Sequence, residues 1–187
     1  MLKVALTGGI ASGKTFVLNF FAKKGISTIN SDKIVADLYE DRVVKEKVLT
    51  QFGTLDKKEI ANQIFSSQEK KNLLEGLLHP LVVKELKQRF EELEKQNTRL
   101  VIVEVPLLFE AGLENLFDKI IAIQVSRKKQ LARLEENGLN KAEAVSCIES
   151  QFSTKEKVKK SDFVIDNSKD KEFVCKQANK ILGALDG

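Results

Sequence analysis

The chain has 187 residues, 42% of them hydrophobic, and its 31 Lys and Arg against 27 Asp and Glu give a formal net charge of +4. This length suits one ordinary domain with a continuous core, which excludes a chain that is disordered as a whole and makes metal or disulfide staples unnecessary. The mild basic excess is spread through helical-looking segments, so it is compatible with anionic ligands and does not by itself indicate nucleic acid.

The N-terminal apolar run is too short to be the core of a signal peptide. The most apolar stretch, residues 100–103, is interrupted at once by Glu104, so it does not predict a membrane span. The two cysteines, Cys147 and Cys175, lie far apart without metal-binding spacing, and we interpret them as free thiols in a reducing compartment. We therefore expect a cytoplasmic protein with no membrane segment.

Five short apolar or β-branched runs predict strands, at residues 2–6, 27–29, 100–105, 119–125 and 163–165. Helical patterns fill the intervals between them. The first helix should begin at the Gly13-Lys14-Thr15 turn and end at Gly25. It should bury Val17, Phe20 and Phe21 on one face. Because strand, helix and strand follow in that order, the strands should pair in parallel, which predicts an α/β fold.

Residues 32–97 look almost wholly helical. We expect a break near Gly53 and a restart at Pro80, whose fixed φ favours the first helical turn. From Pro80 onward, apolar residues recur at helical spacing while Lys and Glu occupy the other face. This block indicates a helical insertion on an α/β core. We interpret the charge run Lys155 to Lys160 as a solvated helix face.

The segment Gly8-Gly9-Ile10-Ala11-Ser12-Gly13-Lys14-Thr15 matches G-x-x-x-x-G-K-[ST], directly after an apolar strand and directly before an amphipathic helix. Its glycines let successive backbone N–H groups turn inward around an anion, and the helix N-terminus adds its own. Lys14 would reach the β- and γ-phosphates of ATP, and the Thr15 hydroxyl would bind Mg²⁺. We expect the segment from Gly8 to Phe16 to bind nucleotide, with an incidental glycine-rich turn as the structural alternative.

Two carboxylates follow strands whose carboxyl ends should meet at the ligand crevice of a parallel sheet. Glu104 ends the third strand, where it either helps to hold Mg²⁺ through water or merely closes a buried strand. Asp32 follows the second strand. There it either accepts the proton of an attacking hydroxyl or only complements the dipole at a helix N-terminus.

Five motifs occur in order along the chain: Leu6 to Thr15, Asn30-Ser31-Asp32, Leu78-His79-Pro80, Val105-Pro106-Leu107-Leu108-Phe109-Glu110, and Asp162 to Asn167. In these motifs nearly the whole chain resembles the dephospho-coenzyme A kinase family. Members of this family phosphorylate the ribose 3′-hydroxyl of dephospho-coenzyme A with ATP, in the last step of coenzyme A synthesis.

The resemblance implies a P-loop NTPase-like, three-layer α/β/α fold with a five-stranded parallel sheet. Its core would take residues of about 1–31, 98–126 and 160–187, with a helical substrate-binding insertion at about 32–97 and a helical lid at about 127–159. ATP, Mg²⁺ and dephospho-coenzyme A would be the ligands. We expect no nucleic acid or membrane partner, and a monomer.

The resemblance also implies roles for single residues. Asp32 would be the catalytic base, and Lys14 and Thr15 would keep their P-loop roles. His79 would lie near the acceptor, although it equally suits a cap of the helix that begins at Pro80. Residues that would line the acceptor site are Pro106, Leu107, Leu108 and Phe109, although core packing explains the last three nearly as well.

The chain departs from the family pattern at several positions. Asn30 replaces the usual first acid before Asp32, and Ala36 stands where many relatives have arginine. The lid segment 130–138 is one residue short and lacks a second arginine before its Asn-Gly pair. This leaves Arg133 as the main candidate to stabilise charge on the transferred group, with Arg127 in reserve.

Two rival functions follow from the P-loop alone. One is another small-molecule or nucleoside monophosphate kinase on the same fold. The other is a nucleotide switch protein. The guanine signature N-K-x-D, which would support this function, is missing: the nearest segment, residues 140–143, reads Asn-Lys-Ala-Glu.

Overall fold

The computed structural model describes residues 1–185, with the side chain of Phe65 excepted. The chain divides into two compact units. Residues 1–30 with those from 97 onward form one, which we call the core unit, and residues 31–96 form the other, which we call the helical unit. The helical unit spans the segment where the sequence predicts an insertion. Its role in acceptor binding remains a prediction.

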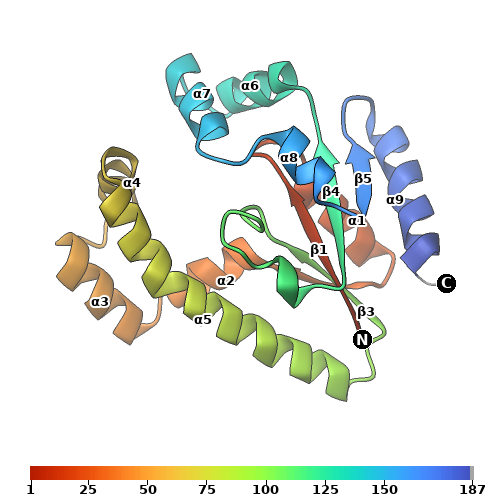
Figure 1. The fold of residues 1–187 in the computed structure, drawn as a ribbon, viewed down its shortest axis with the longest axis horizontal. Coiled ribbons are helices and arrows are strands. Elements are labelled where there is room, and N and C mark those ends of the chain that lie inside the picture. Colours follow the sequence, from red (N-terminus) through yellow and green to blue (C-terminus); the bar gives the residue numbers. More distant parts are fainter. Residues whose placement is uncertain (186–187) are drawn as a thin grey trace. The chain divides into compact units, whose positions relative to one another are not determined.

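The described core unit contains a five-stranded parallel sheet with the strand order β2-β3-β1-β4-β5 (Figure 1). Each strand lies where the sequence predicts it, with ends shifted by one or two residues: β1 (Leu2–Gly8), β2 (Ser27–Asn30), β3 (Leu100–Glu104), β4 (Lys119–Gln124) and β5 (Phe163–Asp166). After β1 the chain first forms β2 and β3 on one side of that strand, and it later forms β4 and β5 on the other side. The carboxyl end of β1 is therefore the topological switch point, where open α/β sheets bind ligands.

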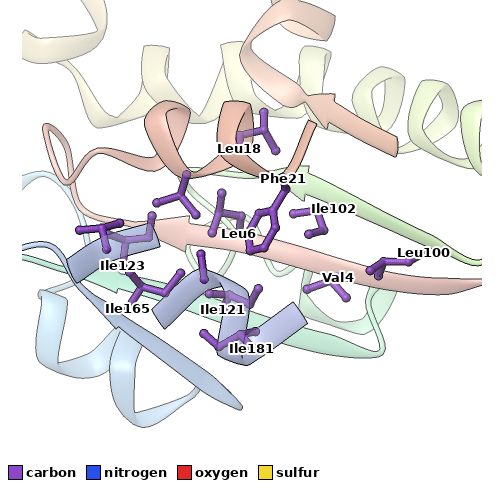
Figure 2. Packing of buried hydrophobic residues seen from close by; sticks show 13 residues of the cluster. Val4, Leu6, Leu18, Phe21, Leu100, Ile102, Ile121, Ile123, Ile165 and Ile181 are labelled. Atoms are coloured by element: carbon purple, nitrogen blue, oxygen red, sulfur yellow. The ribbon is translucent and has the colours of Figure 1, made fainter. Parts of the chain in front are cut away.

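The main hydrophobic core lies between the strands and two helices, α1 (Lys14–Lys23) and α9 (Lys171–Leu185). Figure 2 shows the ring of Phe21 directed from α1 onto the strands. Alternate strand residues such as Leu6 and Ile123 belong to this cluster, whereas Ala5 and Ala122 point to the opposite face of the sheet and are also fully buried. Both faces are thus covered, as a three-layer α/β/α fold requires.

The remaining described elements of the core unit follow β3: the short 3₁₀ helix η1 (Glu114–Leu116), α6 (Arg127–Glu136), α7 (Lys141–Glu149) and α8 (Thr154–Lys159). Figure 1 shows α6 and α7 beyond the carboxyl end of β4. Helix α8 packs against β1 and β4, so the last part of the predicted lid belongs to the layers around the sheet. Cys147 and Cys175 are free and half-buried.

The helical unit consists of α2 (Ser31–Leu38), α3 (Arg42–Phe52), α4 (Lys57–Ser66) and α5 (Gln68–Lys95). The predicted break near Gly53 is confirmed: Gly53 ends α3 in a left-handed conformation with a φ of 72°. Asp56 then caps α4 by accepting hydrogen bonds from the backbone N–H groups of Lys58 and Glu59. A small core of α3, α4 and α5 side chains, including Val48 and Leu78, holds the unit together.

The predicted helix restart at Pro80 is wrong, because α5 runs through Pro80 for 28 residues without a new N-terminus. Its buried residues recur every four positions, at 74, 78, 82, 86 and 90. Proline removes one backbone hydrogen bond, but a continuous buried stripe on both sides of it favours one helix over two. His79 consequently lies inside a helix, half-buried, and does not cap one. In residues 1–185, even α5 lacks the uninterrupted apolar length that a bilayer requires.

Candidate functional site

The loop between β1 and α1 has a backbone that requires glycine at two places. Gly13, the residue before α1, has a φ of 93°, and a Cβ there would collide with the side-chain amide of Asn167. A Cβ on Gly8 would come within 2.6 Å of the carbonyl oxygen of Ile123. None of the described side chains caps the N-terminus of α1. Its first backbone N–H groups and its positive dipole end are therefore available to an anion.

Lys14 lies across this loop with its side chain 8% exposed. Its ammonium donates hydrogen bonds to the carbonyl oxygens of Gly8 and Gly9, at 3.1 and 3.0 Å. A buried ammonium at this position adds a full positive charge to the partial charges of the loop and the helix end. The loop therefore has the electrostatics that polyphosphate binding needs.

The outer side of the loop is held by three side chains from distant elements. The carbonyl oxygens of residues 10–12 accept hydrogen bonds from Gln130 Nε2, Arg133 Nη1 and Asn167 Nδ2, at 2.8, 2.8 and 2.7 Å. Gln130 is buried on α6, and Asn167 follows β5. These bonds fix which way the loop carbonyls point. They also place Arg133, which the sequence selects as the lid arginine, directly against the loop.

Thr15 and Glu104 are brought together as the sequence predicts for a metal site. The Thr15 hydroxyl donates to Glu104 Oε1 at 3.0 Å, and Glu104 is 2% exposed. Asn30 Nδ2 donates to the other carboxylate oxygen of Glu104, also at 3.0 Å. Asn30 and Glu104 are neighbours in the register of β2 and β3. Asn30, which departs from the family pattern, therefore holds the Glu104 carboxylate in place.

Replacing Asn30 by aspartate is expected to lower the melting temperature by about 3 °C at pH 8, because two carboxylates would then meet where an amide now donates. The loss should shrink as the pH is lowered to 5, because a lower pH favours the protonated form of either carboxyl group and so weakens their repulsion. Thermal unfolding at both pH values measures this, with Asn19→Asp on the exposed face of α1 as the matched control. Equal melting temperatures for Asn30→Asp and the unchanged chain at pH 8 would contradict this role of Asn30.

A pocket of about 690 Å³ lies beside the loop, entirely within the core unit. Its size suits a small-molecule or cofactor ligand. Basic and acidic residues both line it, and so does Phe16. The full lining comprises residues 11–16, Glu104, Arg133, Glu136, Asn137, Asn167 and residues 169–171. Arg127 is not part of this lining; it forms an exposed ion pair with Glu149 at 2.6 Å.

The turn after β3, residues 106–110, carries the predicted acceptor wall. Leu108 is fully buried and Phe109 is 7% exposed, so their side chains pack in the core and do not form a binding surface. For Leu108 this burial favours the second of the two interpretations, core packing. Leu107 is 37% exposed and remains a candidate. The carbonyl oxygen of Pro106 accepts a hydrogen bond from Lys157 Nζ at 2.7 Å.

The interpretation of Lys155 to Lys160 as a solvated face is wrong at Lys157. This side chain is fully buried and forms an ion pair with Glu110 at 2.8 Å. Burial lowers the pKa of the Lys157 ammonium, and the hydrogen bond and charge of Glu110 oppose that shift. Charge counting misses such a residue, because only a partner far away in the sequence makes its burial tolerable.

Asp32 and His79 belong to the helical unit. Asp32 is exposed in the first turn of α2 and follows β2 by two residues. His79 is half-buried on α5, which packs against α2. The loop residues, Glu104 and Arg133 are thus gathered in the core unit. The roles of Asp32 and His79 remain predictions.

The chain has clear relatives among known proteins. A family model described as dephospho-CoA kinase matches residues 2–172. A dephospho-CoA kinase of Fusobacterium nucleatum is 36% identical over an alignment of 194 positions, which covers 97% of each chain. Two solved structures are each 27% identical, with 98% of this chain and 96% of the other covered: a protein from Thermus thermophilus, with a TM-score of 0.86, and a dephospho-CoA kinase from Campylobacter jejuni, with a TM-score of 0.69.

Proposed function

The chain belongs to the dephospho-CoA kinase family, and on this premise we propose that it transfers the γ-phosphoryl group of ATP to the ribose 3′-hydroxyl of dephospho-CoA. The observation that supports this most directly is the loop from Gly8 to Thr15, with the Lys14 ammonium across it and a pocket beside it. Phosphoryl transfer depends mainly on positioning and on charge stabilisation, and the loop offers both through backbone N–H groups and a buried cation.

We propose that Thr15 and Glu104 hold Mg²⁺ next to the phosphates. Their hydroxyl and carboxylate oxygens are the hard ligands that this ion prefers. The Thr15 hydroxyl donates its proton to Glu104, which leaves its oxygen lone pairs to a cation. No cluster of three or more His, Cys, Asp or Glu within residues 1–185 could hold a metal by itself, so phosphate oxygens and water would complete the shell. Bound Mg²⁺ would offset charge on the β- and γ-phosphates.

Of the two lid candidates, we propose Arg133 as the arginine that stabilises the transferred group. It lines the pocket, and one of its N–H groups already reaches the loop carbonyl of Ala11. Arg127 is engaged by Glu149 on the exposed side of α6 and α7. An arginine suits this role because its planar guanidinium can donate to a second oxygen while one donor is held.

We propose that Asp32 orients the 3′-hydroxyl of dephospho-CoA and accepts its proton as the phosphorus–oxygen bond forms. The carboxylate is exposed, as a base that meets a diffusing substrate must be. His79, Pro106 and Leu107 are the further residues that we assign to the acceptor. The reaction leaves the proton on Asp32 and the γ-phosphoryl group on the ribose, with ADP as the second product.

The test of the function is ADP release by the purified chain with and without dephospho-CoA, together with product identification by mass. We expect ADP release to depend on dephospho-CoA and the product mass to be that of CoA. Nucleosides, nucleoside monophosphates and shikimate serve as alternative acceptors in parallel assays. Turnover with one of these and none with dephospho-CoA would reassign the acceptor. ADP release that is independent of any acceptor would favour a nucleotide switch protein.

A further inference from the structure

Two consecutive residues between α7 and α8 contact two loops that lie far apart in the sequence. Gln151 Oε1 accepts a hydrogen bond from the backbone N–H of Ile10, in the phosphate-binding loop, at 2.9 Å. The backbone N–H of Phe152 donates to Glu110 Oε1, in the turn 106–110, also at 2.9 Å. One short piece of backbone therefore connects the nucleotide loop with the turn that follows β3.

The Glu110 end of this connection is held by a buried charge. Lys157 Nζ lies 2.8 Å from the Glu110 oxygen that also accepts from Phe152, and it donates to the carbonyl of Pro106. The second oxygen of Glu110 is buried without a hydrogen-bond partner among the described residues. The charge of Glu110 is thus balanced by Lys157, whose side chain is fully buried, and the Glu110 side chain is only 15% exposed. Such pairs depend on geometry, because losing one partner leaves the other charge buried alone.

A second cation lies at the same junction. The ammonium of Lys160 is 5.4 Å from the ring centroid of Phe109 and 5.4 Å from that of Phe152. It therefore joins the turn 106–110 to the α7–α8 connection a second time, on the exposed side. Lys157 and Lys160 both come from the C-terminal part of the α8 segment. The Lys157 side chain contacts the turn 106–110, whereas that of Lys160 contacts both this turn and the α7–α8 connection.

We propose that Gln151 and Phe152, together with the Glu110–Lys157 ion pair that holds the acceptor of the Phe152 N–H, form a brace that keeps the phosphate-binding loop and the turn 106–110 in one relative position. None of these residues lines the nucleotide pocket. The brace is a positioning element, and it acts on the nucleotide through Ile10. Because coupling between two sites is reciprocal, a change at the turn should alter MgATP binding. That this turn also serves the acceptor rests on the proposed function.

The first test replaces Lys157 by methionine, which has a similar length and removes the ammonium. MgATP affinity, measured by titration calorimetry without any acceptor, is expected to fall about fivefold. Lys159→Met, on the same helix and exposed, is the matched control and should bind MgATP as the unchanged chain does. Unchanged MgATP affinity in a folded Lys157→Met chain would overturn the brace.

The second test replaces Gln151 by alanine and does not require the buried pair to change, so it also decides the matter if Lys157→Met does not fold. This variant removes only the acceptor of the Ile10 N–H. We expect weaker MgATP binding together with a KM for dephospho-CoA that rises about fivefold, while kcat changes little. A rise confined to the KM for ATP would show that Gln151 supports the nucleotide loop alone, and would refute the connection.

Non-additivity gives the decisive comparison. Because Gln151 and Lys157 act through one connection, the double variant should weaken MgATP binding by less than the product of the two single effects. If the two single effects on MgATP affinity multiply in the double variant, Gln151 and Lys157 act as two independent supports, which contradicts the brace. Calorimetry with MgATP needs no acceptor, so the brace can be judged even if the unchanged chain forms no CoA, a result that would sink the proposed function alone.

Discussion

Asp32→Asn is expected to lower kcat by at least about a hundredfold while the chain still folds and binds MgATP. Asparagine has almost the same shape as aspartate but cannot accept the proton of the 3′-hydroxyl. The structural cost should be small, because an exposed acid in the first turn of α2 contributes about 0.3–1 kcal/mol through the helix dipole. In this variant kcat should therefore fall strongly while the thermal stability changes little.

Steady-state ADP release at saturating substrates measures the effect on kcat, and calorimetry with MgATP and thermal unfolding serve as the two checks. Asp37→Asn is the matched control: it makes the same change on the same helix, also at an exposed position. Its kcat should stay within about twofold of the unchanged chain. If Asp32→Asn keeps near-normal turnover, Asp32 only complements the helix dipole and another group must take the proton.

Arg133→Met is expected to reduce kcat by about a thousandfold, because arginines that offset charge on a transferred phosphoryl group contribute factors of that order. The variant also loses the hydrogen bond to the carbonyl of Ala11, so weaker MgATP binding should accompany the loss of rate. Arg133→Lys keeps the charge without the planar fork and should recover only part of the rate.

Single-turnover quench measurements separate the chemical step from nucleotide binding in these variants. Arg127→Met is the companion variant, since it removes an arginine from the same helix that is paired with Glu149 and outside the pocket. We expect its single-turnover rate to remain near that of the unchanged chain. A large loss of single-turnover rate in Arg127→Met, with none in Arg133→Met, would give the charge-stabilising role to Arg127 in place of Arg133.

The strands were predictable because each is a short apolar or β-branched run, a signal that depends only on local sequence. The signal is clearest in the interior strand β3, whose five residues are all buried. Pro80 shows the limit of local rules. Proline favours a helix start, but the buried stripe at Leu78, Val82 and Leu86 extends over both sides of it, and tertiary packing decides. The same holds for Lys157, whose burial depends on a carboxylate 47 residues away in the sequence, at Glu110.

The residues of the phosphate-binding loop were predictable from the sequence, whereas the side chains that hold the loop from distant elements were not. The phosphate-binding loop follows from glycines and a lysine at fixed spacing, since those residues act on their own neighbours. Gln130, Gln151 and Asn167 were missed as loop supports, because each meets the loop across more than a hundred residues of sequence. An uncharged amide in a helix or after a strand gives no periodic or charge signal of such a contact.

The hydrogen bonds to the carbonyls of residues 10–12 have a consequence for the energetics of nucleotide binding. A flexible glycine-rich loop would lose conformational entropy on meeting a phosphate, at a cost of about 1–2 kcal/mol for each residue that becomes fixed. Here Gln130, Arg133 and Asn167 restrict the loop when the chain folds, before any nucleotide arrives. The free energy of the phosphate contacts is then expressed as affinity, since little of it is consumed in ordering the loop.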